Sequence, residues 1–232
     1  MTANSQSVSL RSVPTLGTVP ARVDVPALVL FGDVIRSRRE PIAATAWLRV
    51  LTADLAGAYA AADILAPFEF TQGDEIQGLL ARPADPIRAV MRATLHPEAV
   101  KMRWVVVAGE IDPGHGPATQ RSGPAFIQAR ERLAVAVARR ERLAVVSGDP
   151  ATDELLEVLA PLLGELLADL TDRQREIAWP ILIDGLRRSE AAERLGVSRA
   201  TISVAADRAH LRSLGELARV VRILVGRATM GA

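Results

Sequence analysis

The sequence contains no cysteine and a single lysine, Lys101. The absence of cysteine excludes disulfides, thiolate metal sites and cysteine nucleophiles, and it suits a reducing cytoplasm. Any metal ion must therefore bind to oxygen or to one of the three histidines. Every other basic residue is an arginine. This bias suits bidentate phosphate recognition, although a genome rich in G and C produces the same bias.

Long apolar runs are also missing. No stretch approaches the roughly 20 apolar residues that a membrane span needs, and the start of the chain has no apolar segment of signal-peptide length. We therefore expect a soluble, cytoplasmic protein without a membrane partner. Residues 1–24 are rich in Ser, Thr and Pro, a composition that predicts a disordered N-terminus.

Hydrophobic residues make up 49% of the 232 residues, which is enough for one sizeable core or two modest ones. Charge is distributed unevenly along the chain. Residues 171–232 carry 11 arginines against 7 acidic residues, a balance of +4, whereas the remainder has 17 basic and 20 acidic residues, a balance of −3. The basic end is the natural place for a polyanionic partner.

Residues 25–148 predict alternating strands and helices. The predicted strands are residues 26–34, a hairpin on both sides of Asp74, and residues 101–111; the predicted helices are residues 41–62, 84–95 and 124–140. This order predicts an α+β fold with a ferredoxin-like βαββαβ sheet and helices on one face. In that arrangement the first strand is central and lies beside the hairpin.

Two aspartates interrupt apolar stretches, in "VLFGDV" and in "QGDEIQGLL". A carboxylate at the end of a buried strand is costly unless something binds it, and the predicted sheet brings Asp33 and Asp74 to one edge. Two carboxylates with waters and substrate phosphates are a common way to hold Mg²⁺. The pair therefore indicates a Mg²⁺ or Mn²⁺ site that faces a phosphate. The alternative is that both Gly-Asp pairs are only turns.

The blocks "LVLFGDVIRSRR", "QGDEIQGLL", "RWVVVAGEI" and "SGPAFIQARERLA", in this order, resemble the SatD family. The same blocks are similar to a remote version of the class III nucleotidyl cyclase fold, and the resemblance covers about residues 25–148. It implies that Asp33 and Asp74 bind metal together with a backbone carbonyl at Val34, and that a nucleotide is the ligand. It also implies that Arg130, if the protein is an enzyme, is the catalytic arginine that stabilises transition-state charge.

Two positions depart from the cyclase pattern. Phe70 replaces the lysine that reads the base, and Phe126 replaces the asparagine that orients the substrate. A pocket that depends on hydrogen bonds fails when its donors are lost. The resemblance therefore favours binding of a metal-nucleotide over cyclisation.

Other polar residues are expected near the same edge. Glu75 should face away from Asp74 if the strand is regular, and neither Glu75 nor Glu110 is expected to be a ligand. His115, Arg121 and Arg103 are expected to be solvated surface residues.

Residues 149–170 predict a leucine-rich linker helix that Pro161 kinks or divides. Its wide apolar face needs a partner. Docking onto either domain is one explanation and a homodimer interface is the other; the terminal stretch "LGELARVVRILVG" is a second candidate for that interface.

Residues 171–232 predict an all-α domain. Thr171 and Gln174 form a capping box at the start of its first helix. Ser189 is expected to cap a short second helix, Gly196 to form a tight turn, and Ser198 to cap a third helix.

The phrase "AERLGVSRATIS" resembles the helix-turn-helix of LuxR-type regulators and of sigma-factor region four. Such a unit places the start of its last helix in the major groove of double-stranded DNA, where Arg199 could bind a guanine edge. Arg194 and Arg212 would be further backbone contacts. The predicted DNA-binding residues are Arg187, Arg188, Ser198, Arg199, Ala200, Thr201, Ser203 and Arg208. The alternative is a helical interaction module without DNA.

The sequence thus predicts a disordered segment (1–24), a cyclase-like domain (25–148), a linker helix (149–170) and a helix-turn-helix domain (171–232). The leading hypothesis is a homodimeric, cytoplasmic transcriptional regulator whose degenerate cyclase-like domain senses a metal-nucleotide. A metal-dependent nucleotide-processing enzyme and a dimerisation scaffold without a ligand are the alternatives.

Overall fold

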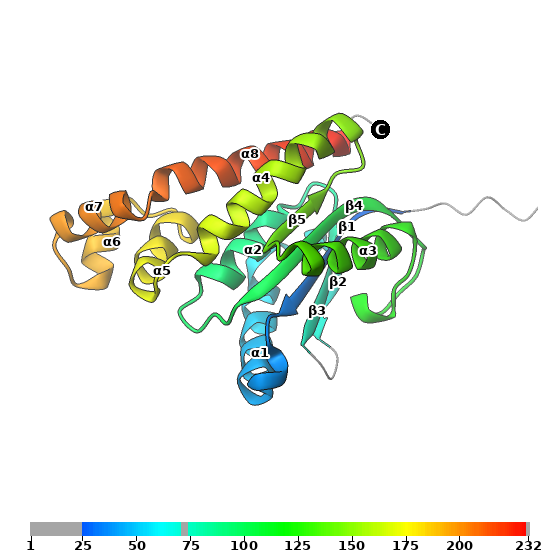
Figure 1. The fold of residues 1–232 in the computed structure, drawn as a ribbon, viewed down its shortest axis with the longest axis horizontal. Coiled ribbons are helices and arrows are strands. Elements are labelled where there is room, and N and C mark those ends of the chain that lie inside the picture. Colours follow the sequence, from blue (N-terminus) through cyan, green and yellow to red (C-terminus); the bar gives the residue numbers. More distant parts are fainter. Residues whose placement is uncertain (1–24, 71–73, 231–232) are drawn as a thin grey trace, which may run out of the picture.

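The computed structural model describes residues 25–70 and 74–230 (Figure 1). The predicted disordered N-terminus and the turn of the hairpin lie outside the described residues. The fold is α+β, with helices packed around a five-stranded mixed sheet. Across the described ranges, none of the helices has the length and apolar character to cross a bilayer.

The sheet has the strand order β2-β3-β1-β4-β5. Strand β1 lies between β3 and β4 and is antiparallel to both, so the predicted central position of the first strand beside the hairpin is confirmed. A short fifth strand extends the sheet, parallel to β4. The strands are β1 (Val25–Val34), β2 (Ile64–Phe70), β3 (Glu75–Ala81), β4 (Met102–Ile111) and β5 (Leu143–Val146).

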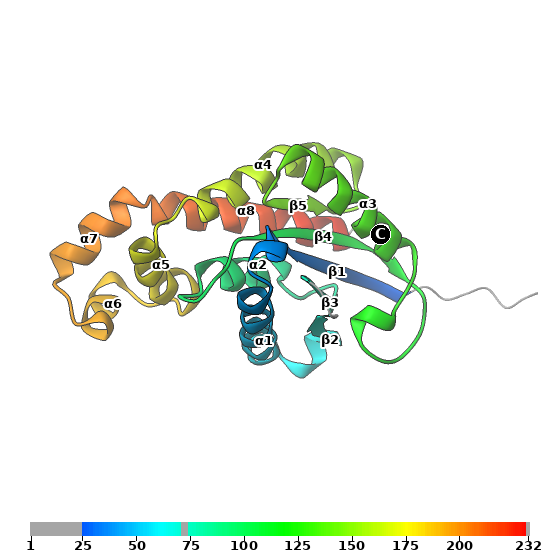
Figure 2. The ribbon, with the colours of Figure 1, turned by 60° about the horizontal axis from the view of Figure 1, so that its bottom comes forward.

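Helices cover both faces of the sheet (Figure 2). Helices α1 (Pro41–Ala58) and α2 (Pro86–Leu95) lie on one face, whereas α3 (Pro124–Arg139) lies on the other. The prediction of helices on one face is therefore wrong for α3. Strand β1 explains the difference, because Leu28 and Leu30 point into one core while Val29 points into the other. A strand that is apolar on both faces needs cover on both.

The C-terminal part of the chain is helical. It contains α4 (Pro150–Ala168), α5 (Asp172–Ala178), a π-helical turn (Trp179–Ile183), α6 (Arg188–Leu195), α7 (Arg199–Arg208) and α8 (Leu211–Met230). Helices α4 and α8 run side by side in opposite directions, and α6 and α7 lie at one end of the molecule (Figures 1 and 2).

One hydrophobic core joins the sheet to these helices. A single cluster of buried residues contains Leu30 of β1, Leu163 of α4, Ile202 of α7 and Val225 of α8. The sequence predicts a boundary at residue 148, but the apolar packing is continuous across it. The C-terminal helices are therefore fixed against the sheet by buried side chains.

Helix α4 docks through its inner face, where Leu156, Leu163 and Leu167 are buried. It continues through Pro161 and is not divided there. Docking, one of the two explanations for the leucine-rich face, therefore accounts for this side of the helix. Leucines on the outer side remain exposed.

A polar contact adds to the apolar packing. Arg92 of α2 donates hydrogen bonds of 2.7 and 2.5 Å to the two carboxylate oxygens of Asp54 in α1. Its guanidinium also lies 4.9 Å from the ring centre of Trp179. A bidentate pair and a cation–π contact at one arginine link α1, α2 and the C-terminal helices.

Two helical glycines test the docking of α4. A Cβ atom at Gly164 would lie 2.7 Å from the backbone nitrogen of Leu143, whereas a Cβ at Gly57 would have no neighbour within 4 Å. We expect Gly57→Ala to stabilise the protein by about 0.5 to 1 kcal/mol through helix propensity. Gly164→Ala should destabilise it by about 1 to 3 kcal/mol, because α4 must move away from β5. Urea unfolding measures both, and equal stabilisation by the two changes would contradict the docking.

Candidate functional site

The two predicted aspartates lie at the same end of the sheet. Asp33 is opposite Glu75 on β3 and Arg103 on β4. The backbone nitrogen of Val34 donates to the carbonyl of Asp74 over 2.8 Å. The exposed Lys101 is close by, since its carbonyl accepts from Ile35 over 2.8 Å. We call Asp33, Asp74 and Glu75 the carboxylate edge.

Each carboxylate of this edge has a partner within the chain. Nη1 of Arg103 donates to Asp33 over 2.9 Å, and Nε of Arg103 donates to a backbone carbonyl over 3.0 Å. The hydroxyl of Ser37 donates to Asp74. The amide of Gln77 donates to Glu75 over 2.5 Å. All three carboxylates therefore accept hydrogen bonds from side chains of the chain itself, Asp33 and Asp74 from other elements and Glu75 from its own strand.

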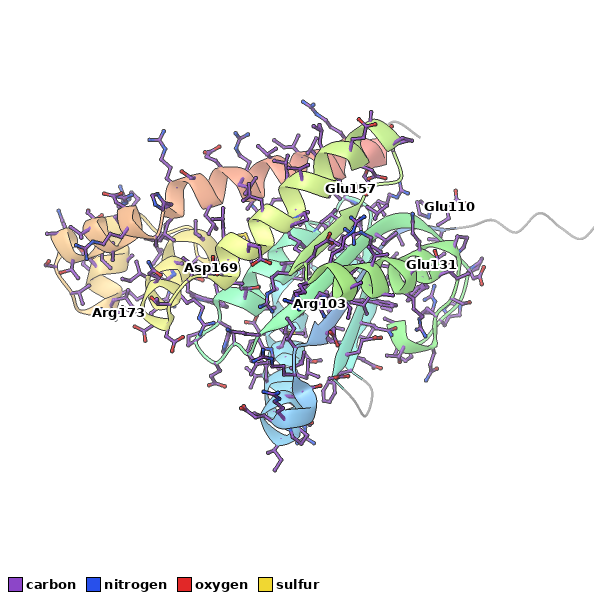
Figure 3. The ribbon with its side chains drawn as sticks, in the orientation of Figure 1. Arg103, Glu110, Glu131, Glu157, Asp169 and Arg173 are labelled. Atoms are coloured by element: carbon purple, nitrogen blue, oxygen red, sulfur yellow. The ribbon has the colours of Figure 1, made fainter. Side chains whose placement is uncertain are left out.

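Arg103 is only 8% exposed, so the expectation of a solvated surface residue is wrong (Figure 3). Its position opposite Asp33 follows from the antiparallel register of β1 and β4. Both residues can be seen in the sequence, but the strand register that places them opposite each other cannot. Glu110 lies at the other end of β4, opposite Pro26, and is not part of the carboxylate edge.

Burial raises the pKa of Asp33 above its ordinary value of 3.8. The charges of Asp74 and Glu75 act in the same direction, while the charge and hydrogen bond of Arg103 act against it. Glu75 lies directly opposite Asp33 in the antiparallel register, so their side chains are on the same face of the sheet and the expectation that Glu75 faces away from the pair is wrong. Asp33 is therefore a carboxyl group whose ionisation depends on three neighbours.

The fit of a divalent cation to this edge is poor. In residues 25–70 and 74–230, no three His, Asp or Glu side chains come together as a group that could hold a metal ion. Asp33 already has a guanidinium as its counter-charge, and Asp74 accepts from Ser37. The arrangement fits an internal ion pair better than the predicted two-aspartate centre with Val34, so we derive no metal-dependent step from it.

A groove lies on the α3 face of the sheet, with a volume of about 780 Å³. Phe31, two residues before Asp33, contacts Phe126, with ring centres 6.1 Å apart. The guanidinium of Arg130 lies 5.9 Å from the same Phe31 ring. Arg130 is thus on the sheet face that also carries Asp33. The lining residues include Gln77, Arg121, Phe126, Ile127 and Arg130.

The groove combines charge with apolar surface. Arg121 and Arg130 line it together with Phe126 and Ile127, and two acidic residues, Asp112 and Glu131, also contribute to the wall. Guanidinium groups bind carboxylates and phosphates in a bidentate manner. The two guanidinium groups are therefore the part of this mixed wall that can bind an anionic group beside an apolar or aromatic body, while the two carboxylates oppose it. His115, in the loop that follows β4, is exposed as expected.

The second candidate site is the α6-turn-α7 unit. Gly196 adopts the left-handed conformation (φ 64°), and its backbone nitrogen donates to two carbonyls of α6. The hydroxyl of Ser198 accepts from the backbone nitrogen of Thr201 over 3.0 Å and caps α7. Ala192 and Ile202 are buried in the core. The predicted turn, cap and core positions are therefore confirmed.

The start of α6 differs from the prediction. The helix begins at Arg188, and the carboxylate of Glu190 accepts from the backbone nitrogen of Arg187 over 2.8 Å. Ser189 lies inside the helix and does not cap it. The capping box of Thr171 and Gln174, by contrast, is present at α5 as predicted.

The predicted DNA-binding residues lie on the surface. Residues 198–201, Arg187 and Arg208 are exposed, and Arg188 and Ser203 are partly exposed. Several arginines of this surface have carboxylate partners. The pairs are Arg187 with Glu190 (2.6 Å), Arg188 with Asp207 (2.8 Å), Arg194 with Asp184 (2.5 Å) and Arg199 with Glu193 (3.7 Å). Exposed pairs of this kind contribute only about 0 to 1 kcal/mol, so a phosphate can replace the carboxylate.

Comparisons with protein-family models, curated proteins and solved structures find no match to this chain. The assignment of a function therefore depends on the geometry of the two candidate sites and on the local sequence patterns.

The ionisation of Asp33 can be measured directly by NMR titration of its carboxyl carbon. We expect a midpoint above 3.8 in the wild-type protein. Arg103→Gln should raise the midpoint further because it removes the opposing positive charge, and Glu75→Gln should lower it because it removes a like charge. Because folding raises this pKa, Asp33 should make the protein less stable as the pH rises from 3.8 through the folded-state midpoint. A midpoint below 3.8 in the wild type would contradict the burial of Asp33.

Proposed function

We propose that the chain is a DNA-binding regulator that reads double-stranded DNA with α7. The observation that supports this most directly is the α6-turn-α7 geometry, with Gly196 in the left-handed turn and Ser198 capping an exposed helix start. In a helix-turn-helix the first residues of the second helix contact base edges. Those residues here are Arg199, Ala200 and Thr201.

The charges and small side chains of this surface support the proposal. The side chain of Arg199 is 76% exposed, so it can extend into a groove. Ala200 leaves room for close approach, and Arg208 has no carboxylate partner among the described residues. Arg187 and Arg188 precede or begin α6, where they can bind the phosphate backbone. Phosphate contacts of this kind supply affinity and salt dependence, whereas Arg199 supplies base discrimination.

The resemblance to the SatD family and to helix-turn-helix regulators agrees with this proposal. A cytoplasmic location, a homodimer and the reading of two half-sites belong to the same hypothesis.

Loss of two arginines from this surface should weaken DNA binding. We expect Arg187→Ala with Arg208→Ala to reduce the affinity for duplex DNA at least tenfold at moderate salt. The slope of log affinity against log salt should fall in magnitude by about 2 if both contact phosphates, because each contact contributes about 0.9. Fluorescence anisotropy over a salt series measures both effects.

The control for this experiment removes two charges elsewhere. Arg49 of α1 and Arg139 of α3 are exposed and lie on other elements. Arg49→Ala with Arg139→Ala should change the slope of log affinity against log salt by less than the roughly 0.9 that one phosphate contact contributes. Absence of salt-dependent DNA binding by the wild-type protein, or equal loss in both double variants, would refute the proposal.

The groove beside α3 is the proposed sensor site, with a nucleotide as the ligand. Its support is the position of Arg130 and Arg121 around an apolar wall. Phe70 and Phe126 stand where cyclases have polar residues, so binding rather than turnover is the proposed role. Mg²⁺ or Mn²⁺ would act as the counter-ion of the phosphates.

A sensor must bind one arrangement of the chain better than another to change DNA affinity. Helix α2 contacts β4 on one side and α4, α5 and α8 on the other. Together with α4, which packs directly on β5, it therefore links the sheet to the C-terminal helices.

Calorimetry with ATP and GTP, each with and without Mn²⁺, tests the sensor site. We expect Arg130→Ala to weaken binding roughly tenfold, because it removes a charge-assisted hydrogen bond of about 1.5 kcal/mol or more. Arg139→Ala, at the exposed end of the same helix, is the matched control. If neither nucleotide gives a heat of binding, the result favours the hypothesis of a dimerisation scaffold without a ligand. If the protein consumes nucleotide and Asp33→Ala abolishes this activity, the result favours the hypothesis of a nucleotide-processing enzyme.

A further inference from the structure

The outward side of α4 carries an apolar row. Leu155, Val158, Leu162 and Leu166 are 52%, 66%, 47% and 40% exposed. Their spacing of three and four residues places them on one side of the helix. The inner side of the same helix is occupied by the sheet and by α8, so docking does not explain this row.

Helix α8 continues this apolar surface. It lies beside α4, and its Val220 and Ile223 are 36% and 39% exposed. Figures 1 and 2 show the two helices together at the surface of the molecule. The outward side of the pair is therefore an apolar surface that spans two antiparallel helices. We call it the α4/α8 face.

The charges of the two helices are opposite. Helix α4 contains four acidic residues and no basic one, whereas α8 contains four arginines and one glutamate. Glu154 and Glu165 are exposed on α4, and Arg219 and Arg227 are exposed on α8. Arg219 pairs with Glu216 of the same helix over 2.7 Å, an exposed pair whose carboxylate a second copy can replace. The less exposed Arg222 pairs with Asp85 of α2 over 2.7 Å and is not counted in this face. The α4/α8 face thus has an acidic helix on one side and a basic helix on the other.

We propose that the α4/α8 face binds a second copy of this chain. A two-fold axis parallel to the helices would place each α4 on the α8 of its partner, which joins acidic to basic residues and covers both apolar rows. An axis perpendicular to the helices would place α4 on α4 and bring like charges together. Charge complementarity therefore favours the first arrangement. In it the α4/α8 pair of one copy stacks on the α8/α4 pair of the other, and the two copies make identical contacts.

The size of the face agrees with a dimer. Helix α4 has 19 residues, a length of about 28 Å at 1.5 Å per residue, and two adjacent helices are about 20 Å wide. Two such faces bury roughly 1,100 Å² in total, which exceeds the roughly 1,000 Å² expected of a specific interface.

The same axis places both α7 helices at one end of the dimer. A rotation about an axis parallel to α8 keeps the start of α8 at the same end in both copies, and α7 directly precedes α8. The dimer would therefore present two DNA-reading helices to one duplex, although its formation does not depend on DNA binding.

Exchange of charges tests the pairing of α4 with α8. The α4 variant is Glu154→Arg with Glu165→Arg, and the α8 variant is Arg219→Glu with Arg227→Glu. Each variant alone places like charges opposite each other, so its dimer should dissociate at least tenfold more readily than the wild type. An equimolar mixture restores opposite charges at both contacts and should form a heterodimer. Analytical ultracentrifugation of the full chain without DNA measures the dimerisation of the α4 variant, of the α8 variant and of their mixture.

Two further variants separate this face from other exposed apolar residues. Leu162→Glu should give a monomer, while Ile42→Glu, at an 86% exposed position on α1, should leave the dimer unchanged. Circular dichroism checks that each variant is folded. A wild-type protein that stays monomeric at all concentrations overturns the proposal and leaves the face to another protein or a lipid surface. The proposal is also overturned if the α4 variant and the α8 variant form no heterodimer when they are mixed.

Discussion

Helix α2 is enclosed on nearly every side, and this burial constrains the whole molecule. Its buried residues are Pro86, Ile87, Ala89, Val90, Met91, Ala93 and Leu95. The helix contacts α1 and β4 as well as α4, α5 and α8. Asp85 caps α2 and also pairs with Arg222 of α8. The C-terminal helices are therefore packed onto the rest of the fold rather than tethered to it, and movement of either part must repack this helix.

The features that the sequence predicted correctly are those with local causes. Gly196, Ser198 and the capping box at Thr171 each depend on residues within one turn, so the chain order alone identifies them. The central position of β1 is the exception, since it is not local and was inferred from the order of strands and helices. The start of α6 was missed because an arginine precedes it, and its backbone nitrogen is bonded by Glu190 rather than by a serine hydroxyl.

The features that the sequence missed depend on contacts between distant residues. Asp33 and Arg103 are 70 positions apart, and only the register of β1 and β4 brings them together. Their pairing changes the interpretation of the carboxylate edge. A carboxylate that looked in need of a metal ion has a guanidinium at 2.9 Å. The position of α3 on the second face likewise depends on contacts between distant residues, because Phe126 and Ala129 cover Val29 and Phe31 of β1.

Lys101 gives the chain a single side-chain amine. It is exposed at the residue before β4, and its carbonyl is bonded to Ile35 just beyond β1. Amine-directed chemistry at mildly alkaline pH therefore has one side-chain target, next to the carboxylate edge and far from α7 in the sequence. Once the α-amine is blocked, a dye attached to this side chain would report from one known position, because no other lysine competes for it.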